Sequence, residues 1–400
     1  MPATAYCQDD RAMSPRYGNY QMDIYRAGLR GVLPRFPADF ATMEVRAAQA
    51  LPAWVLSYVA GGAGDERTQR ANVEAFAKWG IVPRMMEGAR DRDMSVSFCG
   101  IDVPHPLFLC PVGILGICSQ DMHGDLATAR AAARTGVPMV ASTLSQDPLE
   151  DVAAALGDTP GIFQLYPPRD RDVAVSLIQR AERAGFRALV VTLDTWITGW
   201  RPRDLNAANF PQLRGFCLAN YFSDEQFRKR LAASPEAEPE SAIEEFSRIF
   251  GHSMSWADLQ WVREATTLPI LLKGICHPDD VRRAKDLGID GVYCSNHGGR
   301  QANGGLPALQ MLPAVVAAAG DTPVLFDSGV RSGSDVVKAL ALGATAVGTG
   351  RPYAYALAVG GEEGVEHHLR SFLAEADLLM AVNGMPSIAR LREAGLVRVE

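Results

Sequence analysis

The sequence has no apolar run that approaches the ~18 residues needed to cross a membrane as a helix. Its first residues show no basic segment followed by an apolar one, so we expect no secretory signal. Basic residues are in deficit, with 39 Lys and Arg against 46 Asp and Glu, and the net charge of −7 disfavours nucleic acid or an anionic membrane as a partner. These absences favour a cytoplasmic protein that binds neither.

Cysteine and histidine are too scattered to suggest a disulfide framework or a metal centre. The seven cysteines include no C-x-x-C pair, and several lie in apolar runs, which favours reduced core thiols. His367 and His368 are adjacent in a segment of helical spacing and cannot share a helix face, and the other histidines show no ligand spacing. The composition, 48% hydrophobic and 21% charged, allows a large core in one domain with appendages or in two domains.

Short apolar runs rich in β-branched residues alternate with stretches of helical spacing from about residue 107 onward. The runs are Leu107–Val112, Met139–Ser142, Ile162–Tyr166, Ala188–Asp194, Pro269–Lys273, Gly291–Asn296, Val324–Asp327 and Ala344–Gly348. Helical stretches that end at glycine, as helix C-termini prefer, include 124–136, 170–185, 278–288 and 332–343. Strands that alternate with helices form a parallel sheet. Eight such units over roughly 250 residues predict an α/β fold of the (β/α)8 TIM-barrel type.

Segments outside this alternation are expected to pack on the barrel. The N-terminal residues show weak periodicity, and we expect an arm that lies on the body or on a neighbouring subunit. Apolar side chains from Ala38 to Ala60 form a rough stripe that predicts one helix, ended by the glycines that follow. The last helix is expected from Glu362 to Ala381. The expected division is an arm at 1–35, a barrel domain at 36–385 and a tail at 386–400.

One connection is much longer than the others. After the strand that ends at Asp194, the next begins only at Pro269, and connections longer than ~15 residues are usually lids or disordered. The segment 234–240 is polar, and we expect it to be poorly structured. Because the connection leaves the carboxyl end of the fourth strand, we predict that an insertion at 202–254 forms a mobile cover over the site. A surface excursion or an oligomer contact is the alternative.

Polar side chains follow almost every predicted strand, at the end where a barrel places its chemistry. His297 and Arg300 lie three residues apart on a turn that two glycines let bend. The loops at 327–333 and 348–352 each carry glycines and an arginine, which favours a phosphorylated cofactor over two plain glycine turns. The polar residues at the strand ends are Ser142, Gln164, Tyr166, Thr192, Asp194, Lys273, His297, Arg300, Asp327 and Arg351.

The run Ser295-Asn296-His297-Gly298-Gly299-Arg300-Gln301 resembles the signature of the FMN-dependent α-hydroxy-acid oxidases and dehydrogenases. The resemblance extends from about Ala38 to Ala381 and implies a barrel that binds FMN. The insertion, with Leu193–Trp196 and Trp200–Asp204, is most similar to that of the lactate 2-monooxygenases of this family. No haem-binding extension is visible, so an electron-transferring flavocytochrome is not expected.

The resemblance implies a role for each residue of the substrate site. His297 resembles the base that takes a proton from the substrate, and Asp194 resembles the carboxylate that orients its ring and stabilises its charged form. Two arginines resemble clamps on the substrate carboxylate, which a planar guanidinium meets bidentately, and two tyrosines resemble hydroxyl contacts to the substrate. These four substrate-binding residues are Arg201, Arg300, Tyr58 and Tyr166.

The resemblance also implies a set of FMN contacts. Lys273 resembles the lysine beside the N1–O2 edge of the flavin, where a fixed cation stabilises negative charge on the reduced ring. The others resemble backbone against the ring, polar contacts around it, and the ribityl and phosphate site. They are Pro111, Val112, Gly113, Ser142, Gln164, Thr192, Ser295, Asp327, Gly329, Arg331, Gly350 and Arg351.

The implied reaction is oxidation of an (S)-2-hydroxy acid, L-lactate above all, with O2 as acceptor, in a homotetramer or octamer. An oxidase would release the 2-oxo acid and H2O2, whereas a monooxygenase would retain pyruvate and decarboxylate it to acetate, CO2 and water. The long insertion favours retention. A larger aryl or peptide-derived substrate stays open, because Gly113 and the flexible cover leave room for it. Leu144 stands where glycolate oxidase has a tryptophan, which disfavours glycolate as the substrate. Alternatives of another class are a non-redox FMN-barrel isomerase and an inactive flavin-binding subunit.

Overall fold

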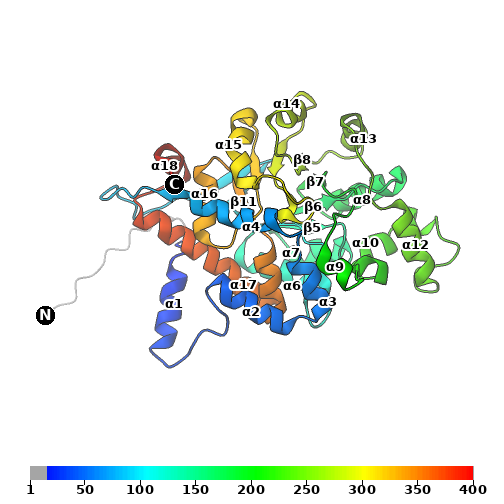
Figure 1. Ribbon diagram of the computed structural model, residues 1–400, viewed down its shortest axis with the longest axis horizontal. Helices are drawn as coiled ribbons and strands as arrows, with labels where there is room; N and C mark the ends of the chain where they lie inside the picture. Colours follow the sequence, from blue (N-terminus) through cyan, green and yellow to red (C-terminus); the bar gives the residue numbers. More distant parts are fainter. Residues whose placement is uncertain (1–15, 400) are drawn as a thin grey trace.

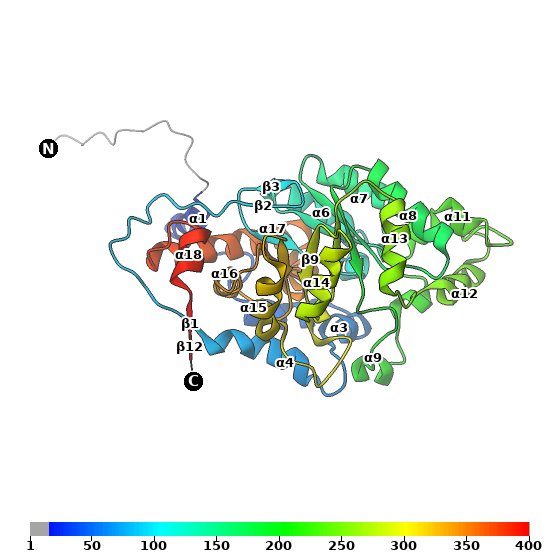
Figure 2. The same ribbon diagram turned by 90° about the horizontal axis from the view of Figure 1, so that it is seen from above.

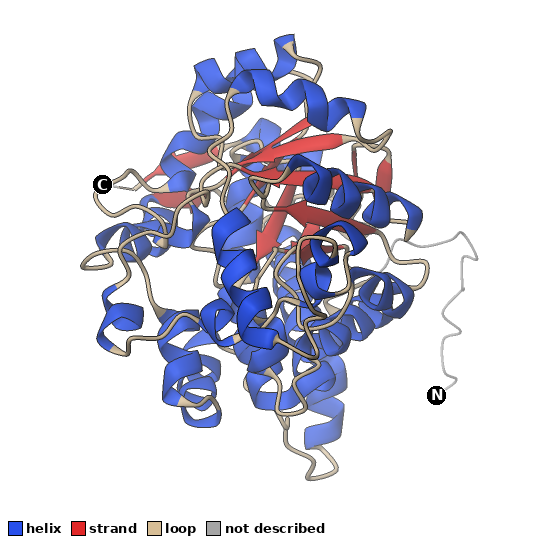
Figure 3. Ribbon diagram, turned by 90° about the vertical axis from the view of Figure 1, so that its right-hand side faces the viewer, coloured by secondary structure: helices blue, strands red, loops and turns tan. Residues whose placement is uncertain are grey.

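The computed structural model describes residues 16–399, and its centre is a closed barrel of eight parallel strands surrounded by helices (Figures 1 and 3). The strands follow one another around the barrel in chain order, which confirms the predicted (β/α)8 fold. They are β4 (Leu107–Leu109), β5 (Met139–Ser142), β6 (Gly161–Leu165), β7 (Ala188–Thr192), β8 (Ile270–Lys273), β9 (Gly291–Cys294), β10 (Val324–Phe326) and β11 (Ala346–Thr349).

Every residue of these strands is buried, which is why the sequence shows continuous apolar runs instead of alternation. Side chains such as Phe108 and Tyr293 fill the interior of the barrel, and other strand residues pack outward under the helices. The hairpin of β2 (Val96–Phe98) and β3 (Ile101–Val103) adds apolar side chains to the inner cluster just before the first barrel strand. It closes the amino end of the barrel, so the carboxyl end is the one available for a ligand.

Helices form the outer layer, and those predicted from glycine-terminated stretches are confirmed. Gly361, with φ 56°, bends the last long helix, and the predicted helix from 362 onward is its second part. The covering helices are α6 (Gly124–Thr135), α7 (Leu149–Leu156), α8 (Arg171–Arg183), α14 (Pro278–Asp286), α15 (Ala308–Ala319), α16 (Gly333–Ala341) and α17 (Arg351–Val382), with the short α5 (Leu115–Cys118) before them.

The segment from 38 to 60 forms two helices, α2 (Phe40–Ala50) and α3 (Ala53–Ala60), so the prediction of a single helix is wrong. The break falls at Pro52, which cannot donate a backbone hydrogen bond inside a helix. The glycines that follow end α3 as expected. After them, α4 (Arg67–Glu74) and a 3-10 turn, η1 (Ala75–Lys78), lead to β1 (Trp79–Ile81).

The expected N-terminal arm lies on the body of the protein over its described part. It forms α1 (Asn19–Gly28), which packs against α17 (Figure 1). The Gly18 N–H donates to the Asp377 carboxylate at 2.8 Å, and the Tyr20 hydroxyl lies 2.6 Å from Nδ1 of His367. The rest of the arm, residues 1–15, lies outside the described residues.

The insertion after β7 is a cap of short helices beside the barrel (Figure 2). Its centre is apolar, because Tyr221, Phe227 and Phe246 are fully buried and make edge-to-face ring contacts. The expectation that 234–240 is poorly structured is wrong at its end, where Pro239 begins a helix at the position that proline favours. The elements are α9 (Pro202–Asn206), η2 (Pro211–Arg214), α10 (Ala219–Phe222), α11 (Glu225–Arg228), α12 (Pro239–Ile249), η3 (Trp256–Asp258) and α13 (Leu259–Glu264).

The C-terminal segment is built into the fold instead of trailing from it. It forms α18 (Ile388–Ala394) and β12 (Leu396–Arg398), and β12 pairs antiparallel with β1. Within residues 16–399, no helix is both long enough and apolar enough to span a bilayer.

Candidate active site

The loop after β9 has a backbone shape that its sequence explains. The side chain of Asn296 accepts a hydrogen bond from the Gly299 N–H at 3.2 Å and so closes a short 3-10 turn, η4 (His297–Gly299). His297 itself has φ 57°, a left-handed conformation that few side chains adopt, and both glycines after it also have positive φ. A methyl group at Gly299 would lie 2.5 Å from the backbone nitrogen of Gln69, so only glycine fits there.

This loop places His297 beside Asp194, which follows β7. Nδ1 of His297 lies 2.8 Å from Oδ1 of Asp194. Burial, reinforced by the charge of Lys273, lowers the pKa of His297, which the Asp194 charge opposes. Burial would raise the pKa of Asp194, but His297 and Lys273 hold it well below its usual range. The pair is therefore a neutral imidazole beside a carboxylate, which suits a general base at neutral pH.

Thr195 is a member of this cluster that the sequence did not reveal. Its hydroxyl donates to Oδ1 of Asp194 at 2.8 Å and lies 3.0 Å from Nδ1 of His297. The only signal in the sequence was its position directly after Asp194. Because it touches both members of the pair, it fixes their relative orientation.

Lys273 lies in the floor of the site between two carboxylates. Its Nζ is 3.9 Å from Asp194 Oδ2 and 4.0 Å from Asp327 Oδ2, and it donates to Ser295 Oγ at 3.1 Å. Burial opposes a charge on this amine, but the two carboxylates raise its pKa, so it is a permanent cation. Ser295 Oγ also accepts from the His297 N–H at 3.0 Å, which links the lysine to the loop of the base.

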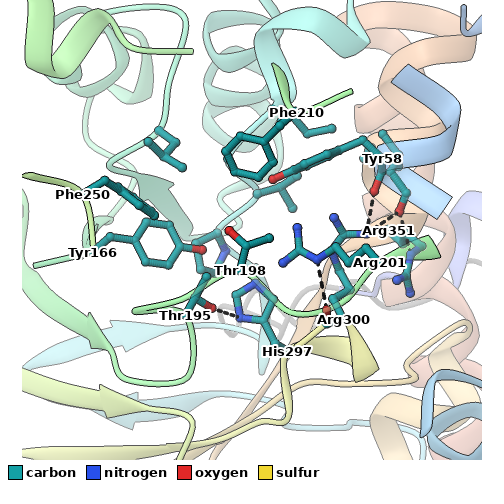
Figure 4. Close-up of a pocket in the computed structure, with 17 residues that line it drawn as sticks. Tyr58, Tyr166, Thr195, Thr198, Arg201, Phe210, Phe250, His297, Arg300 and Arg351 are labelled. Carbon is teal, nitrogen blue, oxygen red and sulfur yellow. Dashed lines mark hydrogen bonds between the residues drawn. The ribbon is translucent and has the colours of Figure 1, made fainter. Parts of the chain in front are cut away.

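Arg201 and Arg300 both lie over the ring of Tyr58, with guanidinium carbons 5.6 Å and 4.9 Å from the ring centre (Figure 4). Arg300 donates to the Tyr58 carbonyl at 2.6 Å and also to that of Gly61. Arg201 donates to the Arg300 carbonyl at 3.0 Å and to the side chain of Gln301. Burial and then the Arg201 charge lower the pKa of Arg300 to about 9. Among residues 16–399 neither guanidinium forms an ion pair within 4 Å, and the charge of the nearby Asp204 carboxylate only partly opposes the lowering of the Arg300 pKa, so an anionic ligand would be bound favourably.

These groups face a cavity of about 700 Å³ at the carboxyl end of the barrel. The predicted residues Tyr58, Tyr166 and His297 line it together with both arginines. Other lining residues are apolar, and they include residues of the insertion that the sequence did not indicate. The cavity's apolar side consists of Val112, Ile114, Leu144, Phe210 and Phe250, and Thr198 lies beside it. A methyl group at Gly113 would lie 3.1 Å from Leu144 Cβ, so Leu144 occupies part of the room expected there.

A second, adjoining cavity brings together most of the residues predicted to bind FMN. Arg331 and Arg351 reach it from two loops, and neither has a carboxylate partner in the described chain. Burial lowers the pKa of Arg351 to about 10. Arg351 is held by Gln69, which accepts at 2.5 Å, and by the Val59 carbonyl at 2.8 Å. The lining is Cys110, Pro111, Val112, Lys273, His297, Gly298, Asp327–Arg331, Gly348, Gly350 and Arg351. Two buried cations with glycine turns fit a phosphate group.

The remaining predicted flavin contacts form one hydrogen-bonded chain across three neighbouring strands. The Ser142 hydroxyl donates to the side-chain oxygen Oε1 of Gln164 at 3.1 Å, and the side-chain amide nitrogen of Gln164 donates to the Thr192 hydroxyl at 3.0 Å. All three side chains are buried. The chain presents polar atoms at the mouth of the barrel, where a flavin ring needs partners.

The fold and this constellation define a (β/α)8 enzyme built for a phosphorylated cofactor and a carboxylate substrate. Residues 47–398 match the family of FMN-dependent dehydrogenases, and the chain belongs to this family. Its cofactor is therefore FMN, and its class is the FMN-dependent α-hydroxy-acid oxidoreductases. Family membership disfavours a non-redox isomerase.

Named relatives are similar over almost their whole length. An L-lactate oxidase of Lysinibacillus sphaericus is 40% identical over 91% of this chain and 93% of the relative. An L-lactate oxidase of Alicycliphilus denitrificans is 43% identical over 85% of this chain and 91% of the relative. Among solved structures, a lactate oxidase of Pediococcus acidilactici superimposes with a TM-score of 0.81 at 32% identity, covering 90% of this chain and 95% of that one. A mandelate oxidase superimposes with a TM-score of 0.80 at 34% identity, covering 91% and 100%.

Proposed function

We propose that the protein oxidises (S)-2-hydroxy acids, L-lactate first among them, to 2-oxo acids, with O2 as the final acceptor and H2O2 as the second product. One observation carries the proposal. His297, which is paired with Asp194, lines the same cavity as the guanidinium groups of Arg201 and Arg300, and this cavity adjoins that of the predicted FMN site. A base opposite a carboxylate clamp is what removal of hydrogen from the carbon beside a carboxylate requires.

Arg201 and Arg300 bind the substrate carboxylate in this proposal. The mutual repulsion of their buried charges makes an anion between them favourable. The hydroxyls of Tyr58 and Tyr166 bind the other polar atoms of the substrate and fix which face of its reacting carbon meets FMN. The apolar wall that includes Leu144 then receives the substrate side chain.

His297 acts as the base. Nδ1 is directed at Asp194, which leaves Nε2 as the nitrogen that takes the substrate proton. Asp194 stabilises the imidazolium that results, and Thr195 holds the carboxylate in place. FMN supplies the redox chemistry by accepting two electrons and passing them to O2. Lys273 is placed to stabilise negative charge at the edge of the bound ring.

A second candidate outcome is oxidative decarboxylation, in which pyruvate stays in the site and is converted to acetate, CO2 and water. The observation that favours it is the origin of one pocket wall. Thr195 and Thr198 lie at the start of the long connection, and Phe210 and Phe250 come from the cap itself. A cap that contributes to the wall is in a position to delay product release.

The deciding experiment is product analysis with L-lactate in air, without catalase. Pyruvate and peroxide in equal amounts would support the oxidase, whereas acetate without free peroxide would support decarboxylation. A mixture of pyruvate and H2O2 without enzyme is needed as a control, because the two react slowly to give acetate. D-Lactate provides the stereochemical control. Failure of every (S)-2-hydroxy acid tested, aryl acids included, to reduce the bound FMN would refute the proposal.

We also propose that the protein acts in the cytoplasm as a homo-oligomer, a tetramer or an octamer. Exposed apolar side chains just before the insertion support the homo-oligomer, since Trp196 and Trp200 are 46% and 73% exposed. Light scattering coupled to gel filtration would measure the subunit number, and a monomer that retains full activity would contradict it.

A further inference from the structure

Two cysteine thiols meet beside the loop of the predicted base. Cys276 follows β8, three residues after Lys273, and Cys294 is the last residue of β9, three residues before His297. The two strands are neighbours, with Lys273 and Tyr293 in register, and the Gly274 N–H donates to the Tyr293 carbonyl at 3.1 Å. The Cys276 thiol donates to the carbonyl oxygen of Ser295 at 3.2 Å, and the Cys294 thiol donates to that of Ala308 at 3.8 Å; the two thiols are close enough that each shifts the pKa of the other.

The two thiols differ in exposure in the way that a reactive pair requires. Cys276 is partly exposed, whereas Cys294 is fully buried. The nearby Cys294 thiol lowers the pKa of Cys276, and the same proximity, with burial, raises the pKa of Cys294. The thiolate is the reactive form of cysteine, so Cys276 is the nucleophile and Cys294 the partner that resolves it.

Other cysteines in the described part of the chain lack this combination. Cys99 is also partly exposed, but burial raises its pKa to about 12, and its sulfur contacts only the Asp290 carbonyl. The thiols of Cys110, Cys118 and Cys217 are buried and have raised pKa values. Cys276 is thus the one thiol within residues 16–399 whose pKa is lowered and whose neighbour is another thiol.

We propose that Cys276 and Cys294 form a peroxide-sensitive dithiol that closes to a disulfide and slows the enzyme. This proposal rests on the proposed oxidase function for its physiological source of peroxide, because that reaction releases H2O2 in the site beside His297 and Lys273. The Cys276 thiolate attacks one peroxide oxygen, breaks the O–O bond and becomes a sulfenic acid, with loss of hydroxide. The Cys294 thiol then attacks this sulfur, forms the S–S bond and releases water. Two thiols are oxidised, and one peroxide is reduced to two waters.

The consequence for activity follows from the neighbours of the two cysteines. A disulfide requires a sulfur separation of about 2.05 Å, closer than two thiols that are not bonded to each other. Closing it draws the residues after Lys273 toward the residues before His297. Ser295 connects both, because its hydroxyl bonds the lysine and the backbone of the histidine. A displacement of about 1 Å at such groups costs up to about a hundredfold in rate.

The test uses the FMN-loaded enzyme and added H2O2, so that it does not depend on whether the enzyme itself makes peroxide. Trypsin would release Cys276 in the peptide 274–282 and Cys294 in the peptide 286–300. In wild type we expect peroxide to join these peptides and to lower the rate of flavin reduction by about ten- to a hundredfold. Dithiothreitol should reverse both effects. The Cys276→Ala variant should bind FMN, reduce it at the normal rate and keep that rate after peroxide.

Cys99→Ala is the matched control, since it removes another partly exposed thiol and should lose activity to peroxide as wild type does. The proposal is overturned if the two peptides are never joined, or if Cys276→Ala is inactivated as fast as wild type. Inactivation that dithiothreitol does not reverse would also overturn it, because it would point to methionine or flavin damage. Peroxide production from L-lactate is measured separately, so failure of the oxidase proposal would be recognised independently.

Discussion

The carboxylate of Asp194 lies 2.8 Å from Nδ1 of His297, and replacing it with asparagine removes the charge with little change of shape. The negative charge stabilises the imidazolium that forms as the base accepts its proton. Two unit charges about 4 Å apart interact by about 4 kcal/mol at an effective dielectric constant near 20. Each 1.36 kcal/mol of barrier is a factor of ten, so we expect Asp194→Asn to slow flavin reduction by about a thousandfold.

The pH profile gives this prediction a second, independent readout. In wild type, burial lowers the pKa of His297, and the Asp194 charge partly offsets the effect. The base must be neutral, so kcat/KM should fall on the acid side with a pKa below 6.5. Without the Asp194 charge the imidazole is harder to protonate. In Asp194→Asn the acid-side fall of kcat/KM should therefore occur at lower pH, and the plateau value of kcat/KM should be smaller than in wild type.

Anaerobic stopped-flow reduction of the bound flavin by L-lactate is the appropriate assay, because it isolates the step in which the base acts. Thr195→Val is the matched control. It removes the hydroxyl that contacts the same two residues but keeps the charge, and the loss of one hydrogen bond should cost about tenfold. The reasoning is refuted if Asp194→Asn reduces its flavin within tenfold of wild type, or if its acid-side fall of kcat/KM moves to higher pH.

Three further variants test other parts of the site and the fold. Arg300→Lys keeps a cation but loses the planar fork, so kcat/KM for L-lactate should fall by about ten- to a hundredfold, chiefly through KM in steady-state assays. Phe250→Ala removes part of the apolar wall and should raise kcat/KM for aryl hydroxy acids relative to L-lactate; an unchanged ratio would place the substrate side chain elsewhere. Arg351→Met should weaken FMN binding by about ten- to a hundredfold in fluorescence titrations of apoprotein and leave riboflavin, which has no phosphate, unaffected.

A further prediction concerns acid stability. His105 is fully buried, neither of its ring nitrogens has a hydrogen-bond partner within residues 16–399, and burial lowers its pKa to about 4. The folded state therefore binds this proton less readily than the unfolded state, whose pKa is near 6.5. The contribution of the neutral His105 ring to the free energy of unfolding is therefore fully present above pH 6.5 and is lost as the pH falls toward 4. His105→Phe should flatten the fall of the thermal midpoint between pH 6.5 and 4, and an unchanged slope would assign that fall to other groups.

The sequence alone was sufficient for the barrel and for most of the site. Parallel barrel strands are covered on both faces, so each appears as a short continuous apolar run, such as the one at Met139–Ser142. Because such strands share one direction, the polar residues after them meet at one end. His297, Lys273 and Asp327 therefore lie together although the sequence separates them by tens of residues.

Local sequence was less informative where the chain leaves this repeating pattern. Pro52 divides the predicted N-terminal helix, because proline has no backbone N–H to donate within a continuous helix, and the rough apolar stripe on both sides of it does not compensate for that loss. Apart from α12, the cap after β7 contains helices of only a few residues, too short to show a period. Its order comes from the contacts of Tyr221 with Phe227 and Phe246, which no local pattern encodes.

What the sequence by itself determined was the set of chemical groups at the carboxyl end of the barrel, because the direction of parallel strands places them there whatever the loops do. Only the tertiary structure decided which of those groups touch. The contact of Thr195 with His297, the support of Arg351 by Gln69, and the proximity of Cys276 to Cys294 each join segments that lie far apart in the chain or follow different strands. Such contacts depend on closure of the barrel and on the packing of each loop, which are long-range properties of the whole chain.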